Sequence, residues 1–297
     1  MSAPTQPRET HRPFQVLAVQ ATPLPLSAPP EHFERHCRDL LDAHPQTQMM
    51  VWPEMHLCAD GQPDLARPEV LRAAAQPLDG PLVARLGRLA RELGVWLVPG
   101  SLCELGPGGE LFNTAVVLGP RGDLVASYRK IFPWRPEEPY TPGGEFCVFD
   151  IEGVGRFGLT ICFDSWFPEV ARNLAWLGAQ TILNLVKTTT PDREQEMVLA
   201  RAHAITQQIN VVTLNAASPP GVGRSAAFGP QGEVLAQLGG CEPGVLEVPI
   251  DHDEVHRVRR EGTAGVTRPW AFFREDDAPL QLPAYRGSID PRAWSRD

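Results

Sequence analysis

The sequence predicts an α/β protein in which helices cover a system of β-strands. Short apolar segments typical of buried strands alternate with amphipathic helices, and Gly-containing turns join several of the strands as hairpins. The chain has 297 residues, of which 42% are hydrophobic and 21% are charged, so it has enough apolar material for a large core. We find no internal repeat, no low-complexity segment and no clear linker, and we therefore predict one main domain over residues 14–251.

Helices are predicted where apolar residues recur every three or four positions along the chain. The clearest case is 82–93, where leucines follow this spacing, arginines occupy the other faces and Gly94 ends the helix. The predicted helices, in order, are 31–43, 82–93, 169–177 and 193–208.

Strands are predicted where short apolar segments end at a turn or at a residue that breaks the pattern. Residues 49–52 run into Pro53, and residues 157–161 run straight into Cys162. The turn at 119–123 contains two glycines and predicts a hairpin. The predicted strands, in order, are 14–20, 49–52, 95–98, 114–118, 124–128, 157–161, 181–186, 211–214, 226–228 and 233–236.

The two ends of the chain differ from the predicted domain. Residues 1–13 are polar and contain proline, which predicts a disordered leader without the apolar segment of a signal peptide. Residues 252–297 form a charged, Pro-containing tail without a strong period. Because no apolar run is long enough to span a bilayer, we expect a cytoplasmic protein.

Charge and cysteine usage argue against several classes of partner and cofactor. The formal net charge is −9 and basic residues do not cluster strongly, so neither nucleic acid nor an anionic membrane is an expected partner. None of the six cysteines forms a Cys-x-x-Cys pair, which gives little support to a zinc or iron–sulfur site. We expect no metal and no organic cofactor.

Three side chains with catalytic potential follow predicted strands. Glu54, Lys130 and Cys162 each come just after a buried strand, and sites in α/β proteins form beyond the carboxyl ends of strands. Each residue also has a simpler interpretation on its own, as the N-terminal charge of a helix, a solvated surface cation and a buried core thiol, respectively. A Cys–His pair has no local signature, and His203 lies inside a predicted helix.

The segments around these residues resemble the signature stretches of the nitrilase superfamily of carbon–nitrogen hydrolases. The segments are Val51-Trp-Pro-Glu54, Tyr128-Arg-Lys-Ile131 and Leu159-Thr-Ile-Cys-Phe-Asp164. Their order and spacing match from about residue 14 to 251, and Phe112-Asn-Thr114 and Pro142-Gly-Gly144 add further agreement. Within the superfamily, residues 128–134 followed by Glu138 are similar to aliphatic amidases and formamidases.

The resemblance implies both a fold and a set of site residues. The fold is a four-layer α-β-β-α sandwich, with two sheets face to face and helices outside. Glu54 corresponds to the general base, Lys130 to the catalytic lysine and Cys162 to the nucleophile. Glu138 corresponds to a second glutamate that holds the geometry of the site. Members of the family usually form homodimers or higher homo-oligomers, and residues 252–297 are a candidate for an arm that reaches across the partner.

The implied chemistry is acyl transfer through a covalent thioester. A carboxylate such as Glu54 accepts the thiol proton and later passes it to the leaving ammonia. The Lys130 ammonium stabilises the tetrahedral oxyanion, with the backbone N–H of Phe163 as a second donor. Water, activated by Glu54, then hydrolyses the thioester, and this cycle requires no cofactor.

Two departures from related enzymes predict a small neutral amide as substrate. Nitrilases usually follow the nucleophile with Trp-Glu, whereas this chain has Phe163-Asp164, which favours amides over nitriles. Carbamoyl-amino-acid hydrolases and ω-amidases typically place an arginine where this chain has Ser165 and Trp166, so the fork that binds a substrate carboxylate is missing from these positions.

The residues that would line the substrate pocket are less clearly marked. Phe163, Trp134, Tyr140 and Trp166 are candidates for its walls, although the last three equally fit core aromatics. Lys187 follows a strand and would favour an anionic substrate instead. An N-carbamoyl or acid-amide hydrolase and a catalytically silent binding protein on the same fold therefore remain as alternatives.

Overall fold

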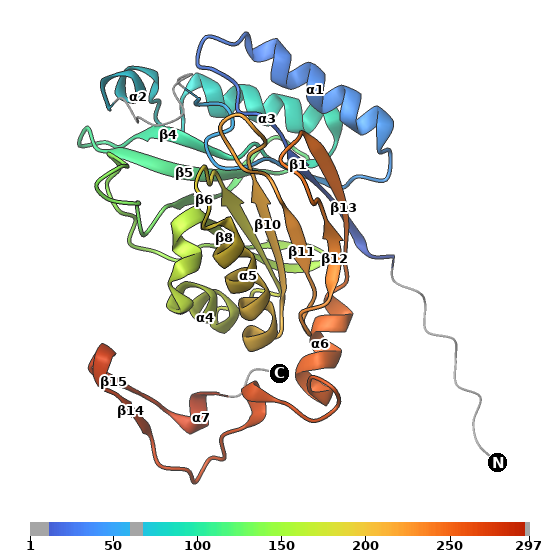
Figure 1. Cartoon of the computed structure of the whole chain (residues 1–297), viewed down its shortest axis with the longest axis vertical. Helices are drawn as coiled ribbons and strands as arrows, with labels where there is room; N and C mark the ends of the chain where they lie inside the picture. The colour runs from blue at the N-terminus through green and yellow to red at the C-terminus, as the bar shows by residue number, and fades with distance from the viewer. Residues whose placement is uncertain (1–11, 60–67, 295–297) are drawn as a thin grey trace, which may run out of the picture.

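Two β-sheets packed face to face form the centre of the protein in the computed structural model, which describes residues 12–59 and 68–294 (Figure 1). Most of the expected leader, residues 1–11, lies outside the described residues. The first sheet has the strand order β13-β1-β2-β3-β5-β4, with β6 paired to β5, and the second has the order β12-β11-β10-β9-β8-β7. The strands of the first sheet are β1 (Phe14–Gln20), β2 (Met49–Val51), β3 (Trp96–Val98), β4 (Ser101–Leu105), β5 (Leu111–Leu118), β6 (Leu124–Arg129) and β13 (Gly244–Ile250). Those of the second sheet are β7 (Val148–Ile151), β8 (Gly155–Ile161), β9 (Thr181–Val186), β10 (Asn210–Asn215), β11 (Ala226–Phe228) and β12 (Val234–Gln237).

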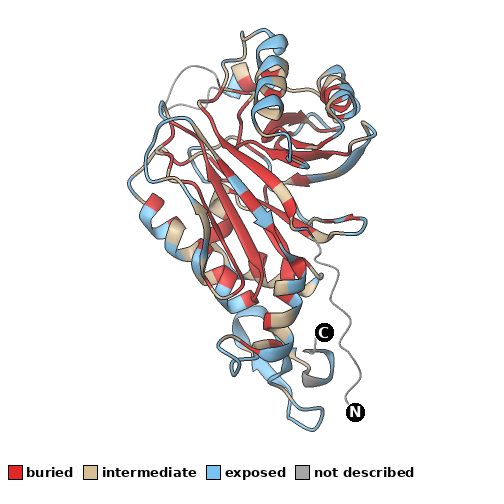
Figure 2. Ribbon diagram, turned by 90° about the vertical axis from the view of Figure 1, so that its right-hand side faces the viewer, coloured by how far each residue is buried: buried red, intermediate tan, exposed pale blue. Residues whose placement is uncertain are grey.

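Helices cover the outer face of each sheet and complete four layers. α1 (Pro30–Ala43) and α3 (Pro81–Leu93) pack on the first sheet, whereas α4 (Pro168–Trp176) and α5 (Arg193–Gln207) pack on the second. Figure 2 shows buried residues concentrated in the strands and on the inner faces of the helices. The remaining helices are α2 (Pro68–Ala74), α6 (His252–Glu261) and α7 (Pro291–Trp294). The predicted α-β-β-α sandwich is therefore confirmed.

Successive side chains of a strand point to opposite faces of its sheet. Each strand therefore contributes both to the core between the two sheets and to the layer between sheet and helices. In β1, Val16 and Ala18 face the core between the sheets, and Leu17 and Val19 face the helix layer. Because both faces of these strands are buried, they appear in the sequence as continuous apolar segments and not as an alternating pattern.

Parallel strands bring several strand ends to the same side of the molecule. β1, β2 and β3 run parallel in the first sheet, and β8, β9 and β10 run parallel in the second. The loop from β10 to β11 lies at the top of Figure 1. The residues that directly follow β2, β8 and β9 are therefore the natural place for a site.

The C-terminal segment that the sequence predicted as a tail begins with a packed helix. α6 buries His252, Val255 and Val258 against the domain. Beyond it, Trp270 is buried beside α4 and α5, and a small hairpin of β14 (Leu280–Leu282) and β15 (Gly287–Ile289) extends below α4 in Figure 1. Within the described residues, no helix is both long and apolar enough to cross a membrane.

Candidate active site

Glu54 lies in the turn that follows β2 and is held by three hydrogen-bond donors. Its Oε1 accepts from Lys130 Nζ at 2.9 Å and from Asn113 Nδ2 at 2.8 Å, and its Oε2 accepts from the backbone N–H of Lys187 at 3.0 Å. The turn passes close to Gly100, where a Cβ atom would come within 2.1 Å of the Pro53 carbonyl oxygen. The Glu54 carboxylate is buried and has a fixed orientation.

Lys130 directly follows β6 and bridges two carboxylates. Its ammonium donates to Glu54 at 2.9 Å and to both carboxylate oxygens of Glu138 at 2.8 Å, and the residue is only 1% exposed. Burial by itself lowers the pKa of this lysine, but the negative charges of Glu54 and Glu138 outweigh it and raise the pKa well above the usual value. Lys130 is therefore a permanent cation in the site.

Glu138 sits in the loop after β6 and is fixed by that loop. The backbone N–H of Trp134 donates to its Oε2 at 2.8 Å, and its own N–H donates to the Trp134 carbonyl oxygen at 2.8 Å. Burial raises the pKa of Glu138, and the neighbouring Glu54 charge adds to this against the opposing effect of Lys130. Two carboxylates thus share one ammonium group.

Cys162 comes immediately after β8 and begins the short 3-10 helix η1 (Cys162–Trp166). Its φ of 49° is unusual for a residue with a side chain, as is typical of strained positions at functional sites. Burial raises the pKa of the thiol well above its usual value, Glu54 raises it further, and Lys130 opposes them. The resting side chain is therefore a neutral thiol within electrostatic range of both groups.

Asp164 ties the segment of Cys162 to that of Lys130, a role that sequence reasoning missed. Its Oδ2 accepts from Tyr128 Oη at 2.7 Å and from the Ile161 N–H at 2.9 Å, and its Oδ1 accepts from the Phe132 N–H at 2.9 Å. The side chain is completely buried. In the sequence, Asp164 was visible only as part of the segment that contains Cys162.

The roles of three more polar residues beside the site were also missed. Asn113 donates to Glu54 through its side chain, and its carbonyl oxygen accepts from the Lys130 N–H at 2.9 Å. Thr188 Oγ1 lies 4.0 Å from Cys162 Sγ and donates to the buried Glu196. In the sequence, Asn113 was visible only as part of the segment Phe112-Asn-Thr114, and Glu196 resembles any polar position of an amphipathic helix.

The residues predicted to line the substrate pocket differ in their surroundings. Trp134 is 43% exposed, whereas Phe163 and Trp166 are half-buried, with ring centroids 6.3 Å apart. Tyr140 is buried in the core of the first sheet layer, where its hydroxyl lies 3.7 Å from Cys103 Sγ and 3.7 Å from Met55 Sδ, so it fits the core alternative. Lys187 is half-buried, and its backbone N–H binds Glu54.

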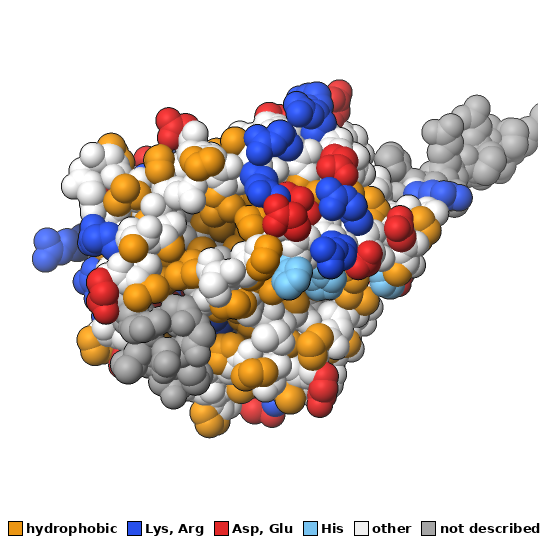
Figure 3. Space-filling model, turned by 90° about the horizontal axis from the view of Figure 1, so that it is seen from above, with side chains coloured by type: hydrophobic (Ala, Val, Ile, Leu, Met, Phe, Trp, Pro, Cys, Tyr) orange, Lys and Arg blue, Asp and Glu red, His pale blue; other side chains and the backbone are white. Residues whose placement is uncertain are grey.

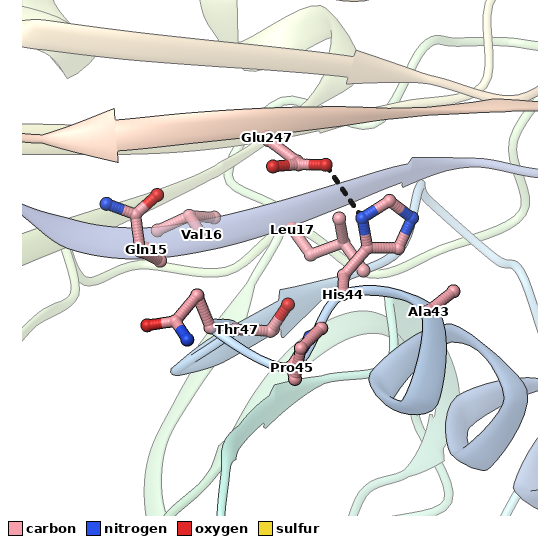
Figure 4. Close-up of a pocket in the computed structure, with 9 residues that line it drawn as sticks. Gln15, Val16, Leu17, Ala43, His44, Pro45, Thr47 and Glu247 are labelled. Carbon is pink, nitrogen blue, oxygen red and sulfur yellow. Dashed lines mark hydrogen bonds and ion pairs between the residues drawn. The ribbon is translucent and has the colours of Figure 1, made fainter.

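The surface provides two hollows of different character. Figure 3, seen from above, shows hydrophobic side chains gathered around a hollow near the middle of the face on which the β10–β11 loop lies. A separate pocket of about 120 Å³ contains the pair of His44 Nδ1 and Glu247 Oε1, 2.7 Å apart (Figure 4). Thr47 in this pocket precedes β2, whereas Glu54 follows it, so the pocket lies at the opposite end of that strand.

A family model of carbon–nitrogen hydrolases matches residues 18–260 of the chain. The chain belongs to this family. Among similar carbon–nitrogen hydrolases, an omega-amidase from Pongo abelii is 32% identical over 204 residues, covering 63% of this chain and 72% of the relative. A formamidase from Bacillus cereus is 32% identical over 181 residues, covering 60% of this chain and 53% of the formamidase.

A solved structure extends this likeness to a covalently modified amidase. A mutant amidase from Nesterenkonia sp., which carries the acetamide moiety of fluoroacetamide on its active-site cysteine, is 27% identical with a TM-score of 0.66. The alignment covers 87% of this chain and 97% of that one. The resemblance to the nitrilase superfamily is confirmed, and the relatives of this carbon–nitrogen hydrolase include amidases.

The site is suited to proton transfer and covalent chemistry at a thiol. It combines a carboxylate with fixed orientation, a permanent ammonium group and a half-buried thiol. Within residues 12–59 and 68–294, no group of three or more His, Cys, Asp or Glu side chains is arranged to hold a metal ion.

Proposed function

We propose that this carbon–nitrogen hydrolase cleaves small neutral amides to a carboxylic acid and ammonia, with Cys162 as nucleophile. The observation that carries the proposal is the contact group of Glu54, Lys130 and Glu138 in electrostatic range of the half-buried Cys162 thiol. It contains a base, a cation and a nucleophile, which are the three groups that acyl transfer needs.

In the proposed cycle, Cys162 Sγ attacks the amide carbon while its proton moves to Glu54. The oxyanion that forms is stabilised by the Lys130 ammonium and by the N–H of Phe163, an amide in the first turn of η1 that has no carbonyl partner within that helix. Glu54 then passes the proton to the leaving nitrogen, the C–N bond breaks and ammonia departs. Water attacks the thioester with Glu54 as base, which releases the acid and restores the thiol.

Charge balance supports a neutral substrate. Glu54 and Glu138 share the single Lys130 ammonium, so the group already carries an excess of negative charge. In the turn after Cys162, Ser165 donates to the Cys162 carbonyl oxygen at 2.9 Å, and the next residue is aromatic. This turn therefore supplies no cation for a substrate carboxylate. The likeness to a formamidase and to an amidase that reacts with fluoroacetamide agrees with this substrate class.

The proposal is tested by ammonia release from a panel of simple amides and nitriles. Cys162→Ala is expected to abolish turnover and Cys241→Ala, which changes an exposed cysteine, is expected to leave it unchanged. Intact-mass measurement after mixing with amide should find the acyl group on Cys162. Unimpaired turnover by Cys162→Ala would refute the proposal, whereas an inert enzyme with an unreactive Cys162 thiol would favour a binding protein.

The alternative with a specific observation in its favour is an acid-amide or N-carbamoyl hydrolase. Lys187 is a half-buried cation whose backbone contacts the proposed base, and an omega-amidase is among the similar proteins. Neutral amides should be compared with matched amides that carry a terminal carboxylate. A preference of ~100-fold for the carboxylates, about 2.7 kcal/mol, that is lost in Lys187→Met would establish this alternative.

We further propose that the enzyme assembles with a second copy of itself. Apolar side chains are exposed on α5 and on the C-terminal segment, including Val198 at 68%, Val266 at 76% and Phe272 at 77%. Exposed apolar side chains that gather into a patch are typical of an interface. Light scattering of the full chain measures the mass of the assembly directly.

A further inference from the structure

A buried polar group that takes no part in the proposed cycle lies next to the nucleophile. Thr188 Oγ1 lies 4.0 Å from Cys162 Sγ, within reach of a hydrogen bond to sulfur. It also lies 2.8 Å and 2.7 Å from the two carboxylate oxygens of Glu196. Glu196 in turn binds Arg193, whose Nη1 is 3.0 Å from Oε2. Thr188, Glu196 and Arg193 are all buried.

The backbone around Thr188 leaves its hydroxyl little freedom. Its N–H donates to Asn215 Oδ1 at 2.8 Å, and its carbonyl oxygen accepts from Asn215 Nδ2 at 3.4 Å. Arg193 is fixed as well, because it donates to Thr213 Oγ1 at 3.1 Å and to the Thr213 carbonyl oxygen at 3.2 Å. These hydrogen bonds fix the position of Thr188, and they therefore also fix the distance of its hydroxyl from the sulfur.

The direction of the hydrogen bonds follows from the number of protons available. A threonine hydroxyl has one proton to donate and two lone pairs. A carboxylate beside an arginine only accepts, so the proton of Thr188 is engaged by Glu196. The oxygen then faces sulfur with a lone pair, and the only proton left for that contact is the one on Cys162. This geometry accommodates S–H and opposes S⁻.

We propose that Thr188, held by Glu196, is a positioning residue that accepts a hydrogen bond from the Cys162 thiol and keeps the resting nucleophile protonated. The proposal rests on the proposed function only in taking Cys162 as the nucleophile. Between turnovers the thiol proton lies toward Thr188, and the thiolate develops only when an amide carbonyl is in place and Glu54 receives the proton. A neutral thiol reacts slowly with electrophiles and oxidants, so this contact protects the enzyme.

Several charged residues act electrostatically on Cys162, and their charges must stay the same when Thr188 is replaced. They are Glu54, Lys130, Glu138, Glu196 and Arg193. None of them changes in Thr188→Val, which has nearly the same shape but lacks the hydroxyl. A shift in the protonation of Cys162 in this variant therefore reports the loss of the hydroxyl and not the loss of a charge, and Glu196→Gln separates the effect of the hydroxyl on sulfur from its hydrogen bond to Glu196.

The experiment measures the rate at which iodoacetamide alkylates Cys162 as a function of pH, without substrate. The labelled peptide is followed by mass spectrometry in a Cys241→Ser background, because Cys241 is exposed. In Thr188→Val the midpoint of the profile should fall by at least about 0.5 pH unit, and the rate below both midpoints should rise about threefold. Thr188→Ser, which keeps the hydroxyl, should match the wild type. If Thr188→Val does not fold, Thr188→Ala takes its place.

Several results would overturn the proposal. An unchanged or higher midpoint in Thr188→Val would show that the hydroxyl does not hold the thiol proton. A lower midpoint in Glu196→Gln with no change in Thr188→Val would assign the effect to the Glu196 charge alone. A change in melting temperature without a shift of midpoint would leave Thr188 a purely structural role. Because no substrate is present, these results are distinguishable from a failure of the amidase proposal, which Cys162→Ala tests by turnover.

Discussion

Replacing Asp164 by asparagine should loosen the connection between the segments that carry Cys162 and Lys130. The carboxylate accepts three hydrogen bonds, from Tyr128 Oη, the Ile161 N–H and the Phe132 N–H, at 2.7–2.9 Å. The amide of asparagine has only one acceptor atom, and its NH₂ group must face at least one of these donors. The tyrosine hydroxyl can rotate and accept instead, but a backbone N–H cannot. In either amide orientation, one buried backbone N–H is left without a partner.

The expected magnitude follows from these contacts. An orphaned buried N–H costs about 1–3 kcal/mol, and the bonds that remain lose the strengthening that a charged acceptor gives. The opposing effect is that burial raises the pKa of Asp164, so a neutral amide avoids part of the cost of burying a charge. We expect a net loss of about 2 kcal/mol in the free energy of unfolding, equivalent to about 4–8 °C in melting temperature.

Function should suffer more than stability, because Asp164 connects the segments that carry Cys162 and Lys130. A displacement of about 1 Å between catalytic groups lowers rates by about 100-fold, so kcat should fall at least tenfold with KM nearly unchanged. The assay combines urea denaturation with ammonia release. Asp150→Asn is the control, since Asp150 is an exposed partner of Arg156 and its loss should cost under about 1 kcal/mol. A variant at Asp164 as stable and active as this control would refute the reasoning.

Three other perturbations test separate parts of the structure. Glu138→Gln removes one of the two carboxylates on Lys130, and we expect kcat to fall about 10–100-fold in a folded protein; wild-type turnover would contradict its role in the site. His56 is buried with a pKa lowered to about 3, mainly by burial, and its ring nitrogens have no partner among the described residues. Because the folded protein favours neutral His56, its contribution to stability is complete above the unfolded pKa and falls as the pH drops toward 3. Between pH 8 and pH 5 the wild type should therefore lose about 2 kcal/mol in the free energy of unfolding that His56→Phe retains. An equal loss in both proteins, measured by urea denaturation at the two pH values, would refute this. Phe272→Ser, at an apolar side chain that is 77% exposed, should lower the mass of the assembly in light scattering, and an unchanged mass would remove this residue from the interface.

The sequence predicted those parts of the protein whose physical cause is local. The helix 82–93 was found because its apolar face has the helical period and Gly94 ends it, and the structure begins it one residue earlier, at Pro81. β4, β7, β13 and the short C-terminal strands β14 and β15 were not predicted. β13 has buried and exposed residues in alternation, but it pairs with β1 across more than two hundred residues of sequence, and only this pairing identifies it as a strand. α6 was hidden because its helical face has few large apolar residues among many charges.

The site residues also divide into those that the local sequence predicts and those that it does not. Glu54, Lys130 and Cys162 were found because each follows a strand within a characteristic segment, and parallel strands bring such ends together. Asp164, Asn113 and Thr188 act through the direction of a single side chain, which depends on packing between elements that are distant in sequence. A polar residue in a buried strand shows that some partner exists. It does not show which one.

The balance of charge around the thiol explains why these hidden residues matter for the chemistry. A thiolate at Cys162 would be a third negative charge beside Glu54 and Glu138, which share only the Lys130 ammonium. The site is therefore unsuited to storing a preformed thiolate, unlike a cysteine paired with a cationic histidine. It is suited to a reaction in which the proton leaves sulfur as the C–S bond forms, because the negative charge then moves to the substrate oxygen, near Lys130. Such a mechanism demands a fixed distance between the thiol and its base, and the buried carboxylate of Asp164 provides a rigid link between the two segments that set it.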